Sequence, residues 1–459
     1  MERANAWKDA DKTKIFDFAE QYRKFISDCK TERECVIEAV KLAKDHGYRN
    51  LDDIVKNKEE LKAGDKVYAV IMKKSIILIN VGEESLENGL NILGAHIDSP
   101  RIDVKQNPLY EDSDLVLLDT HYYGGLKKYQ WVARELSIHG VVAMKDGSII
   151  DINIGDRPGD PVFCVTDLLP HLADQQMKKT GEKVVEGEDL NLLIGSMPAE
   201  TEDKSEKELV KKNILSILKE RYGFEEEDFL SAELEIVPAG EAKNCGFDSS
   251  MIMGYGHDDR VCSYPSLIAL LESDDLKKTG VCILVDKEEI GSVGATGMTS
   301  NFFENTIAEL IDRLGTYSEL SLRRCLANSK MLSSDVSAAL DPNYPSFFEA
   351  KNAAYLGRGV VFNKFTGARG KSGSNDASAE FIGELRSIMD SNDVKFQTAE
   401  LGKVDVGGGG TIAYILARYG MNVIDSGVAV LNMHAPAEII SKVDLYEALK
   451  CYKAFLANA

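Results

Sequence analysis

Residues 281–285 read Val-Cys-Ile-Leu-Val, without a polar position among them. A strand with one face in water alternates apolar and polar residues, whereas a strand covered on both faces is apolar throughout. We therefore expect this run to form a central strand of a parallel or mixed sheet. The chain then reaches two adjacent acids, Glu288 and Glu289. Because functional sites in such sheets form at the carboxyl ends of the strands, these acids are candidates for a site.

Helix-like and strand-like patterns alternate in two separated parts of the chain, residues 1–100 and 242–459. Apolar positions at helical spacing predict two amphipathic helices within residues 17–47 and others at residues 261–271, 299–314, 315–327, 375–389, 411–419 and 443–456. Short apolar runs predict strands at residues 67–72, 75–81, 90–97, 331–335 and 428–433. The alternation predicts one discontinuous α/β domain, with a mixed sheet and helices on both of its faces.

Residues 101–241 differ from the rest of the chain. Short strands and turns dominate there, with predicted strands at residues 137–143 and 148–154 and a charged helix at about residues 204–221. Because this segment interrupts the α/β pattern, we interpret it as an inserted β-rich second domain. Such a domain is expected to cover a site or to make contacts between subunits.

Composition excludes several classes of function. The 459 residues are enough for two domains of roughly 100–200 residues each. Lys and Arg total 54 against 75 Asp and Glu, and the net charge of −21 disfavours binding to nucleic acid. No apolar run reaches the ~20 residues that span a bilayer, and the polar start of the chain lacks a secretory signal, so we expect a cytoplasmic protein without a membrane role. Eight cysteines without a Cys-x-x-Cys pair predict neither disulfides nor a thiolate zinc site.

Five segments place a metal-ligand type of side chain after an apolar run or at the entrance of a helix. They contain His96 with Asp98, Asp258 with Asp259, Glu288 with Glu289, Asp335, and His434. Histidines and carboxylates without cysteine suit zinc, manganese or cobalt in hydrolytic sites. The carboxylates outnumber the needs of one ion, which favours two ions about 3.5–4 Å apart that share a carboxylate and a water.

Each segment alone has an ordinary structural explanation. Asp98 lies two residues after His96, so in a strand both point to one face and Asp98 can orient the imidazole. Taken singly, however, such a pair is better explained by a partly buried histidine at a strand end. Asp258 and Asp259 could cap the following helix. Asp335 could be a turn residue, and His434 could belong to the core. The coincidence of all five segments in an α/β framework favours the metal centre.

Four stretches of the sequence resemble the aspartyl aminopeptidase and vacuolar aminopeptidase I family of metallopeptidases. They are residues 94–101, 286–292, 333–344 and 433–434, which follow one another in the order found in the family. The likeness extends from about residue 17 to the C-terminus. It implies a zinc-peptidase domain and a dinuclear zinc aminopeptidase that acts on short peptides. It also implies a homo-oligomer built through the inserted domain, for which a dodecamer is one candidate.

The resemblance assigns the metal ligands. It implies that Asp258 bridges two zinc ions, that His96 and Asp335 complete one site, and that Glu289 and His434 complete the other. It also implies a cis peptide bond after Asp258. The sequence by itself leaves open whether Asp258 or its neighbour Asp259 is the bridging ligand.

The resemblance also implies roles beyond the ligands. Glu288 is the general base. Independently of the resemblance, the spacing of Asp98 from His96 predicts that Asp98 assists catalysis by orienting the imidazole. His171 corresponds to a family histidine that reaches the active site of a neighbouring subunit, although the local sequence alone predicts the capped start of a helix. Residues 359–373 are only loosely similar to the part of aspartyl aminopeptidases that recognises an acidic side chain, so the preferred N-terminal residue stays open.

Two other functions remain open at this point. One is a metal-dependent N-deacylase on a similar framework, which would act on N-acylated rather than unblocked peptides. The other is a catalytically silent, metal-stabilised scaffold or binding protein. Retention of Glu288 together with every expected ligand argues against the silent protein, because a scaffold has no use for a general base.

Overall fold

The computed structural model describes residues 4–8, 10–203 and 205–459, and they fall into two compact units. The first unit contains the chain up to Asp98 together with Ala242–Met433 and Ala437–Ala459. The second contains Ser99–Glu241 and the short stretch His434–Pro436. The sequence prediction had placed the limits of the inserted domain at residues 101 and 241, with His434 in the α/β domain.

A nine-stranded mixed sheet runs through the described part of the first unit, in the order β1-β2-β3-β14-β4-β15-β19-β17-β18. Its central strands β14, β4 and β15 are parallel neighbours, and β3 joins β14 in the antiparallel direction. The strands are β1 Arg49–Asn50, β2 Lys66–Ile71, β3 Ser75–Asn80, β4 Asn91–His96, β14 Gly280–Val285, β15 Lys330–Ser334, β17 Val360–Asn363, β18 Phe396–Thr398 and β19 Asn422–Gly427. The predicted mixed sheet is therefore confirmed.

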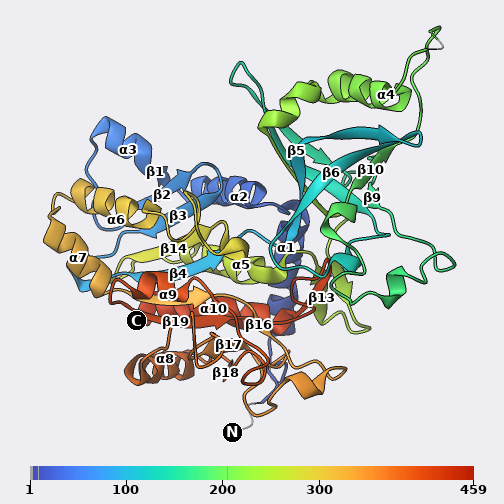
Figure 1. The fold of residues 1–459 in the computed structure, drawn as a ribbon. Coiled ribbons are helices and arrows are strands. Elements are labelled where there is room, and N and C mark those ends of the chain that lie inside the picture. Colours follow the sequence, from blue (N-terminus) through green and yellow to red (C-terminus); the bar gives the residue numbers. More distant parts are fainter. Residues whose placement is uncertain (1–3, 9, 204) are drawn as a thin grey trace. The chain divides into compact units, whose positions relative to one another are not determined.

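Helices cover both faces of this sheet (Figure 1). Alternate residues of β14 belong to different hydrophobic clusters, with Leu284 in one and Ile283 in the other, which explains why the whole strand is apolar. The first cluster contains residues of α1 Lys12–Asp28, α2 Glu32–Asp45, α5 His257–Leu271, α8 Ala379–Ser391 and α10 Lys442–Asn458. The second contains residues of α3 Leu51–Asn57, α6 Phe302–Arg313, α7 Glu319–Ala327 and α9 Ala413–Ala417.

The first unit also carries a smaller sheet of five described strands, in the order β12-β13-β21-β20-β16. These strands are β12 Lys243–Cys245, β13 Met251–Gly254, β16 Ser337–Ala338, β20 Ala429–Leu431 and β21 Glu438–Ser441. β20 corresponds to the strand predicted at residues 428–433 and is shorter than predicted. This sheet matters for the site because β21 begins with an acid, Glu438, that contacts the start of α5.

The second unit is built on an antiparallel sheet of seven described strands, in the order β8-β7-β11-β5-β6-β10-β9. They are β5 Arg101–Asp112, β6 Leu115–Tyr123, β7 Leu136–Ala143, β8 Ile149–Ile154, β9 Cys164–Val165, β10 Leu192–Gly195 and β11 Ala232–Pro238. Phe163, next to β9, forms a bridge with Leu136 of β7, so the sheet curves back on itself as a half-barrel. The helix α4 Leu209–Ile217 packs against β5, β6 and β10 and continues as the π-helical turn η5 Leu218–Tyr222.

Three predictions of local structure were wrong or incomplete. β5 and β6 form a long hairpin where we expected short strands and turns, because the register shift between Val104 and Leu109 interrupts the alternation. β19 was not predicted at all. The charged helix expected from residue 204 begins at Leu209, and residue 204 itself lies outside the described residues. In the part of the chain described, none of the helices combines the length and apolar character that crossing a bilayer requires.

Candidate metal centre

Three neighbouring parallel strands end at the same edge of the large sheet. His96 is the last residue of β4, Asp335 directly follows β15, and Glu288 opens the short 3-10 helix η7 (Glu288–Ile290) just after β14. Since β14, β4 and β15 are adjacent and parallel, their carboxyl ends bring these three side chains together.

The start of α5 supplies the next two acids. Asp258 and Asp259 have non-helical backbone angles, and the peptide bond between them is cis, as the resemblance implied. The hydroxyl of Ser263 in α5 donates to the carbonyl oxygen of His96 at 2.6 Å. The Arg260 side chain donates to the carbonyl oxygen of Ile97 at 3.2 Å. These bonds fix the start of α5 against the end of β4, so that Asp258 faces the imidazole.

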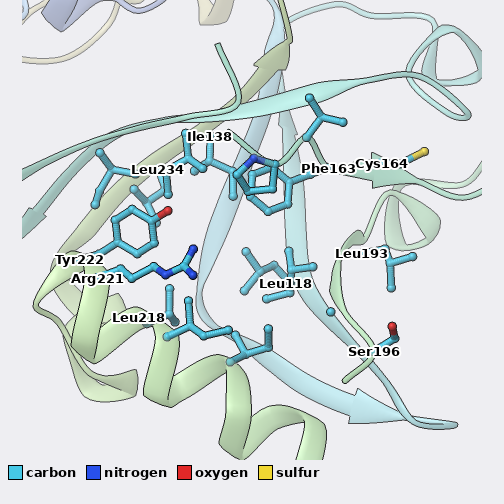
Figure 2. Close-up of a pocket in the computed structure, with 18 of the residues that line it drawn as sticks. Leu118, Ile138, Phe163, Cys164, Leu193, Ser196, Leu218, Arg221, Tyr222 and Leu234 are labelled. Carbon is cyan, nitrogen blue, oxygen red and sulfur yellow. The ribbon is translucent and has the colours of Figure 1, made fainter. Parts of the chain in front are cut away.

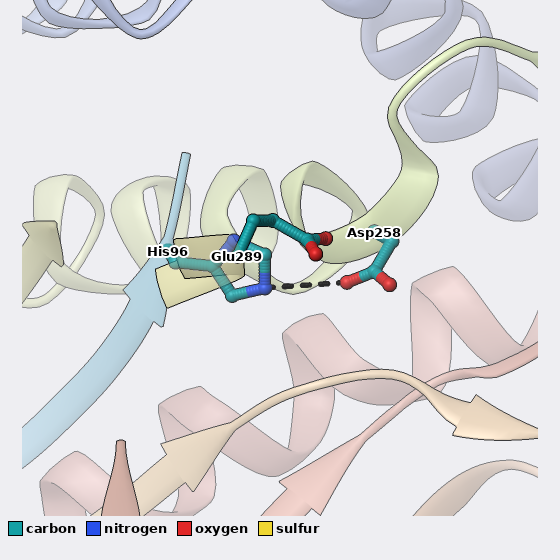
Figure 3. Close-up of side chains that lie close together, drawn as sticks. All are labelled: His96, Asp258 and Glu289. Carbon is teal, nitrogen blue, oxygen red and sulfur yellow. Dashed lines mark ion pairs between the residues drawn. The ribbon is translucent and has the colours of Figure 1, made fainter. Parts of the chain in front are cut away.

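His96 is the centre of the cluster. Its Nε2 lies 3.2 Å from a carboxylate oxygen of Asp258 and 4.0 Å from one of Asp335. Figure 3 shows the carboxylate of Asp258 facing this imidazole and the carboxylate of Glu289 directed toward the space between His96 and Asp258. Among the described residues, three groups hold ligand atoms within 4.8 Å of one another: His96, Asp258 and Glu289; His96, Glu288 and Asp335; and Asp258, Asp259 and Asp335.

Asp98 connects the imidazole to the turn that carries the two glutamates. The Nδ1 atom of His96 lies 3.1 Å from the carbonyl oxygen of Asp98 and 3.4 Å from its carboxylate. The same carboxylate accepts the backbone N–H groups of Glu288 and Glu289 at 3.1 and 3.2 Å. Asp98 is fully buried. One carboxylate therefore fixes both the orientation of the imidazole and the backbone of η7.

The electrostatics of the cluster fit a cation. Burial raises the pKa of Asp335 well above its usual range, and the charges of Glu288 and Asp258 raise it further. Burial also raises the pKa of Asp259. For His96, burial disfavours the charged imidazolium, but hydrogen bonds with Asp258 and Asp98 outweigh it and raise the pKa. A divalent cation among these groups would reverse the repulsion and keep the acids ionised, so the donor set suits bound metal.

His434 and His171 are not part of these groups. His434 is grouped with the second unit, where its Nδ1 lies 2.7 Å from the carbonyl oxygen of Gly125, and no group of described residues includes it. A proton held on Nδ1 leaves Nε2 as the ligand nitrogen, the tautomer that metal-binding histidines commonly use. His171 is exposed in a series of turns before the 3-10 helix η3 (Gln176–Lys178), and not at a capped α-helix start. The roles of both histidines stay predictions.

Sequence reasoning missed two residues that support the site. Glu438, almost fully buried, accepts the backbone N–H of Asp258 at 3.0 Å. Arg260 is also buried, and its guanidinium donates to the carbonyl oxygen of Lys30 at 2.8 Å as well as to Ile97. The signal for Glu438 was present, since an acid stands at the head of an apolar run. Nothing in the sequence indicates that Arg260, which follows the two acids, is a buried supporting residue.

The glycine-rich turn at residues 407–410 has close backbone neighbours. A side chain on Gly407 would meet the carbonyl oxygen of Leu401 at 2.1 Å, and one on Gly408 would meet the backbone of Ala368 at 2.7 Å. Close approach of the chain segments thus accounts for Gly407 and Gly408, whereas a side chain at Gly409 or Gly410 would make only ordinary contacts.

A model of the family described as aminopeptidase I zinc metalloprotease (M18) matches residues 25–456. The chain belongs to this family. It is thus an M18 zinc metallo-aminopeptidase, and the predicted family and enzyme class are confirmed.

Individual M18 relatives agree over the full length. A curated relative, the probable M18 family aminopeptidase 1 of Clostridium acetobutylicum, is 60% identical over 460 residues and covers 100% of this chain and 98% of its own. A crystal structure of an M18 aminopeptidase from Thermotoga maritima has a TM-score of 0.96 and 44% identity, with 100% of both chains covered. The fold is also shared by a structure of the S. cerevisiae mApe1 dodecamer. The TM-score is 0.76 and the identity 21%, with 96% of both chains covered.

Proposed function

We propose that this M18 aminopeptidase removes N-terminal residues from short peptides at the edge where β14, β4 and β15 end, and that it uses two divalent metal ions, namely zinc. The proposed ligands are His96, Asp258, Glu289, Asp335 and His434, with Asp258 shared between the ions. The observation that carries the proposal is the meeting of one imidazole and five carboxylates, those of Asp258, Asp259, Glu288, Glu289 and Asp335, in overlapping groups within 4.8 Å. Asp258 belongs to two of these groups, which supports it over Asp259 as the shared ligand.

The proposed proton carrier is Glu288. When bound, the metal ions supply a lowered pKa for the attacking water and polarise the peptide carbonyl. The Glu288 carboxylate accepts a proton from the attacking water and returns it to the leaving amino group as the C–N bond breaks. Asp98 supports this role because it holds the backbone N–H of Glu288 and thereby the position of the carboxylate. The proposed part of Asp98 in catalysis is positioning.

The basic loop before α8 gives little support to a preference for acidic N-terminal residues. Lys364 and Lys371 both pair with the carboxylate of Asp376, and Lys371 also lies 4.1 Å from the ring centre of Phe365. Asp376 balances one of these two charges, and both ammonium groups are already engaged within the loop. We propose that neutral N-terminal residues are accepted, which peptides that differ only in the first residue would test.

Assembly and location complete the proposal. We propose a homo-oligomer in which the second unit contributes subunit contacts, and the dodecamer of mApe1, which shares the fold, is one example of such an assembly. We also propose a cytoplasmic location. All eight cysteines are free thiols, six of them buried, which suits a reducing compartment.

The test is the variant Glu288→Gln beside Glu83→Gln, an exposed glutamate of the same unit that stands outside all three groups. Metal content is measured by mass spectrometry and hydrolysis with unblocked and N-acetylated dipeptides. We expect Glu288→Gln to keep its metal and lose roughly 10²–10⁴-fold in kcat, and Glu83→Gln to match the wild type. Full activity in Glu288→Gln would refute the assignment of the base, and faster hydrolysis of N-acetylated dipeptides would indicate a deacylase.

A further inference from the structure

The second unit contains a cavity of about 860 Å³ between its curved sheet and the helical segment α4-η5 (Figure 2). This volume lies within the range of roughly 300–1,000 Å³ that is typical of sites for small molecules. The sheet side is formed by apolar side chains of β6, β7, β8, β10 and β11, among them Leu118, Ile138, Leu193 and Leu234. The interior of a small β-barrel is a common place for one apolar ligand.

The cavity arises because two apolar faces oppose each other without filling the space between them. On the helical side the lining residues are Ile214, Ile217, Leu218 and Arg221, whose spacing of three and four residues places them on one face. On the sheet side, Ile152 and Ile154 of β8 are two apart and share a face. Covering an apolar surface of this extent with an apolar ligand in place of water lowers the free energy of the system.

Two arginines give the cavity its charge. Arg134 is half-buried, and its Nε atom has no hydrogen-bond acceptor among the described residues. Its Nη1 reaches only the carbonyl oxygen of Gln130, at 3.5 Å. Burial lowers the pKa of Arg134, and no acid offsets this effect. Because arginine stays charged in proteins, an anion beside it would be favourable.

Arg221 is exposed and lines the cavity, and Figure 2 shows its side chain reaching from the helix into the cavity. No ion pair of Arg221 or Arg134 occurs within the described ranges. Glu135 also lines the cavity, and since Glu135 and Arg221 are both exposed to solvent, water screens both charges. The cavity is therefore an apolar slot with one half-buried cation, Arg134.

We propose that this cavity binds a linear amphiphile, an aliphatic chain that ends in a carboxylate, as in a fatty acid. The aliphatic chain lies between the sheet and α4, and the carboxylate pairs with Arg134, whose guanidinium fork matches a carboxylate in two parallel hydrogen bonds. A narrow aliphatic chain fits this space better than the surface of a folded protein, because α4 lies over the sheet. The residues that line the cavity include none of the proposed metal ligands and neither Glu288 nor Asp98, so the proposed site is distinct from the proposed peptidase chemistry.

The test uses the full-length, metal-loaded enzyme after removal of bound lipid, with dodecanoate and dodecanol as probes in calorimetric titrations. We expect one dodecanoate per subunit and at least tenfold weaker binding of dodecanol. Arg134→Gln should weaken dodecanoate at least tenfold and leave dodecanol unchanged, while Arg157→Gln, an exposed arginine of the same unit outside the cavity, should match the wild type. The proposal would be overturned if dodecanoate and dodecanol bound equally well, or if Arg134→Gln bound dodecanoate as tightly as Arg157→Gln. It would also be overturned if no binding occurred at about 1 mM dodecanoate.

The place of binding is tested by filling the cavity. Leu118→Trp and, on the opposite wall, Ile214→Phe should each abolish binding of both probes without changing the melting temperature by more than a few degrees; a variant that fails to fold is replaced by the other. Hydrogen exchange should show protection of residues 214–221 only when dodecanoate is added. Protection without ligand that disappears when the subunits are dissociated would show that a second copy of the chain fills the cavity, and it would overturn the proposal.

Discussion

Replacing Asp98 with asparagine tests whether one buried carboxylate positions the whole metal edge. In the native protein its carboxylate accepts two backbone N–H groups, from Glu288 and Glu289, at 3.1 and 3.2 Å and lies beside Nδ1 of His96. An asparagine side chain has one acceptor oxygen and one NH2 group. One backbone N–H then keeps a neutral acceptor, and the other faces a donor.

The expected magnitude follows from these contacts. Exchanging a charged for a neutral acceptor costs roughly 1 kcal/mol, and leaving a buried N–H without an acceptor costs about 1–3 kcal/mol. We therefore expect Asp98→Asn to lower the free energy of unfolding of the metal-loaded enzyme by about 2–4 kcal/mol. Because the imidazole of His96 also loses its charged partner, metal affinity should fall about 10–100-fold.

The assay combines urea unfolding at pH 7, metal affinity by chelator competition, and kcat at saturating metal. Asp45→Asn, an exposed acid at the end of α2, is the matched control and should behave as wild type. A purely structural role would lower stability alone, whereas positioning also lowers kcat when metal is saturating. Wild-type kcat and metal affinity in Asp98→Asn would refute the reasoning.

Two further predictions concern metal removal and pH. Chelation should abolish hydrolysis and lower the melting temperature by roughly 10 °C, because the clustered carboxylates lose their counter-ion. Added zinc should restore both the activity and the melting temperature. An unchanged melting curve in scanning calorimetry would contradict the metal centre. Burial raises the pKa of Asp425 in β19 to about 7, so the folded protein holds a proton that the unfolded chain releases near pH 4, and stability falls between about pH 4 and 7. Asp425→Asn, which can still accept from Thr411, should therefore gain about 2–4 kcal/mol in urea unfolding at pH 8 and little at pH 4, and an equal effect at both pH values would contradict this origin.

The sequence was informative where one physical constraint dominates. The strand at residues 280–285 was predictable because helices cover both of its faces and every position is buried. Its neighbours β4 and β15 were predictable because they too are short apolar runs whose positions are almost all buried. In each case the apolar run ends at a polar residue, and this abrupt change pointed to the functional edge.

Other elements escaped prediction because tertiary contacts override local pattern. β19 reads Asn-Val-Ile-Asp-Ser-Gly, which is poor in strand-forming residues. Its polar side chains Asp425 and Ser426 are nevertheless buried, and Thr411 donates a hydrogen bond to Asp425. Likewise Arg260 carries an ordinary charge in the sequence, and only the fold reveals that its donors hold the carbonyl groups of Lys30 and Ile97.

The strand order explains why ligands so far apart in the chain form one cluster. β14 and β15 flank β4 in the sheet, although both follow it in the sequence, and the second unit begins at Ser99, directly after Asp98. A long excursion of the chain thus starts one residue beyond the group that orients His96 and holds η7. Because the Asp98 carboxylate is tied to two backbone N–H groups after β14, its position depends on the sheet and not on the segment that follows. Changes in the length of that segment should therefore leave the geometry of His96, Glu288 and Glu289 intact, whereas loss of the Asp98 carboxylate should not.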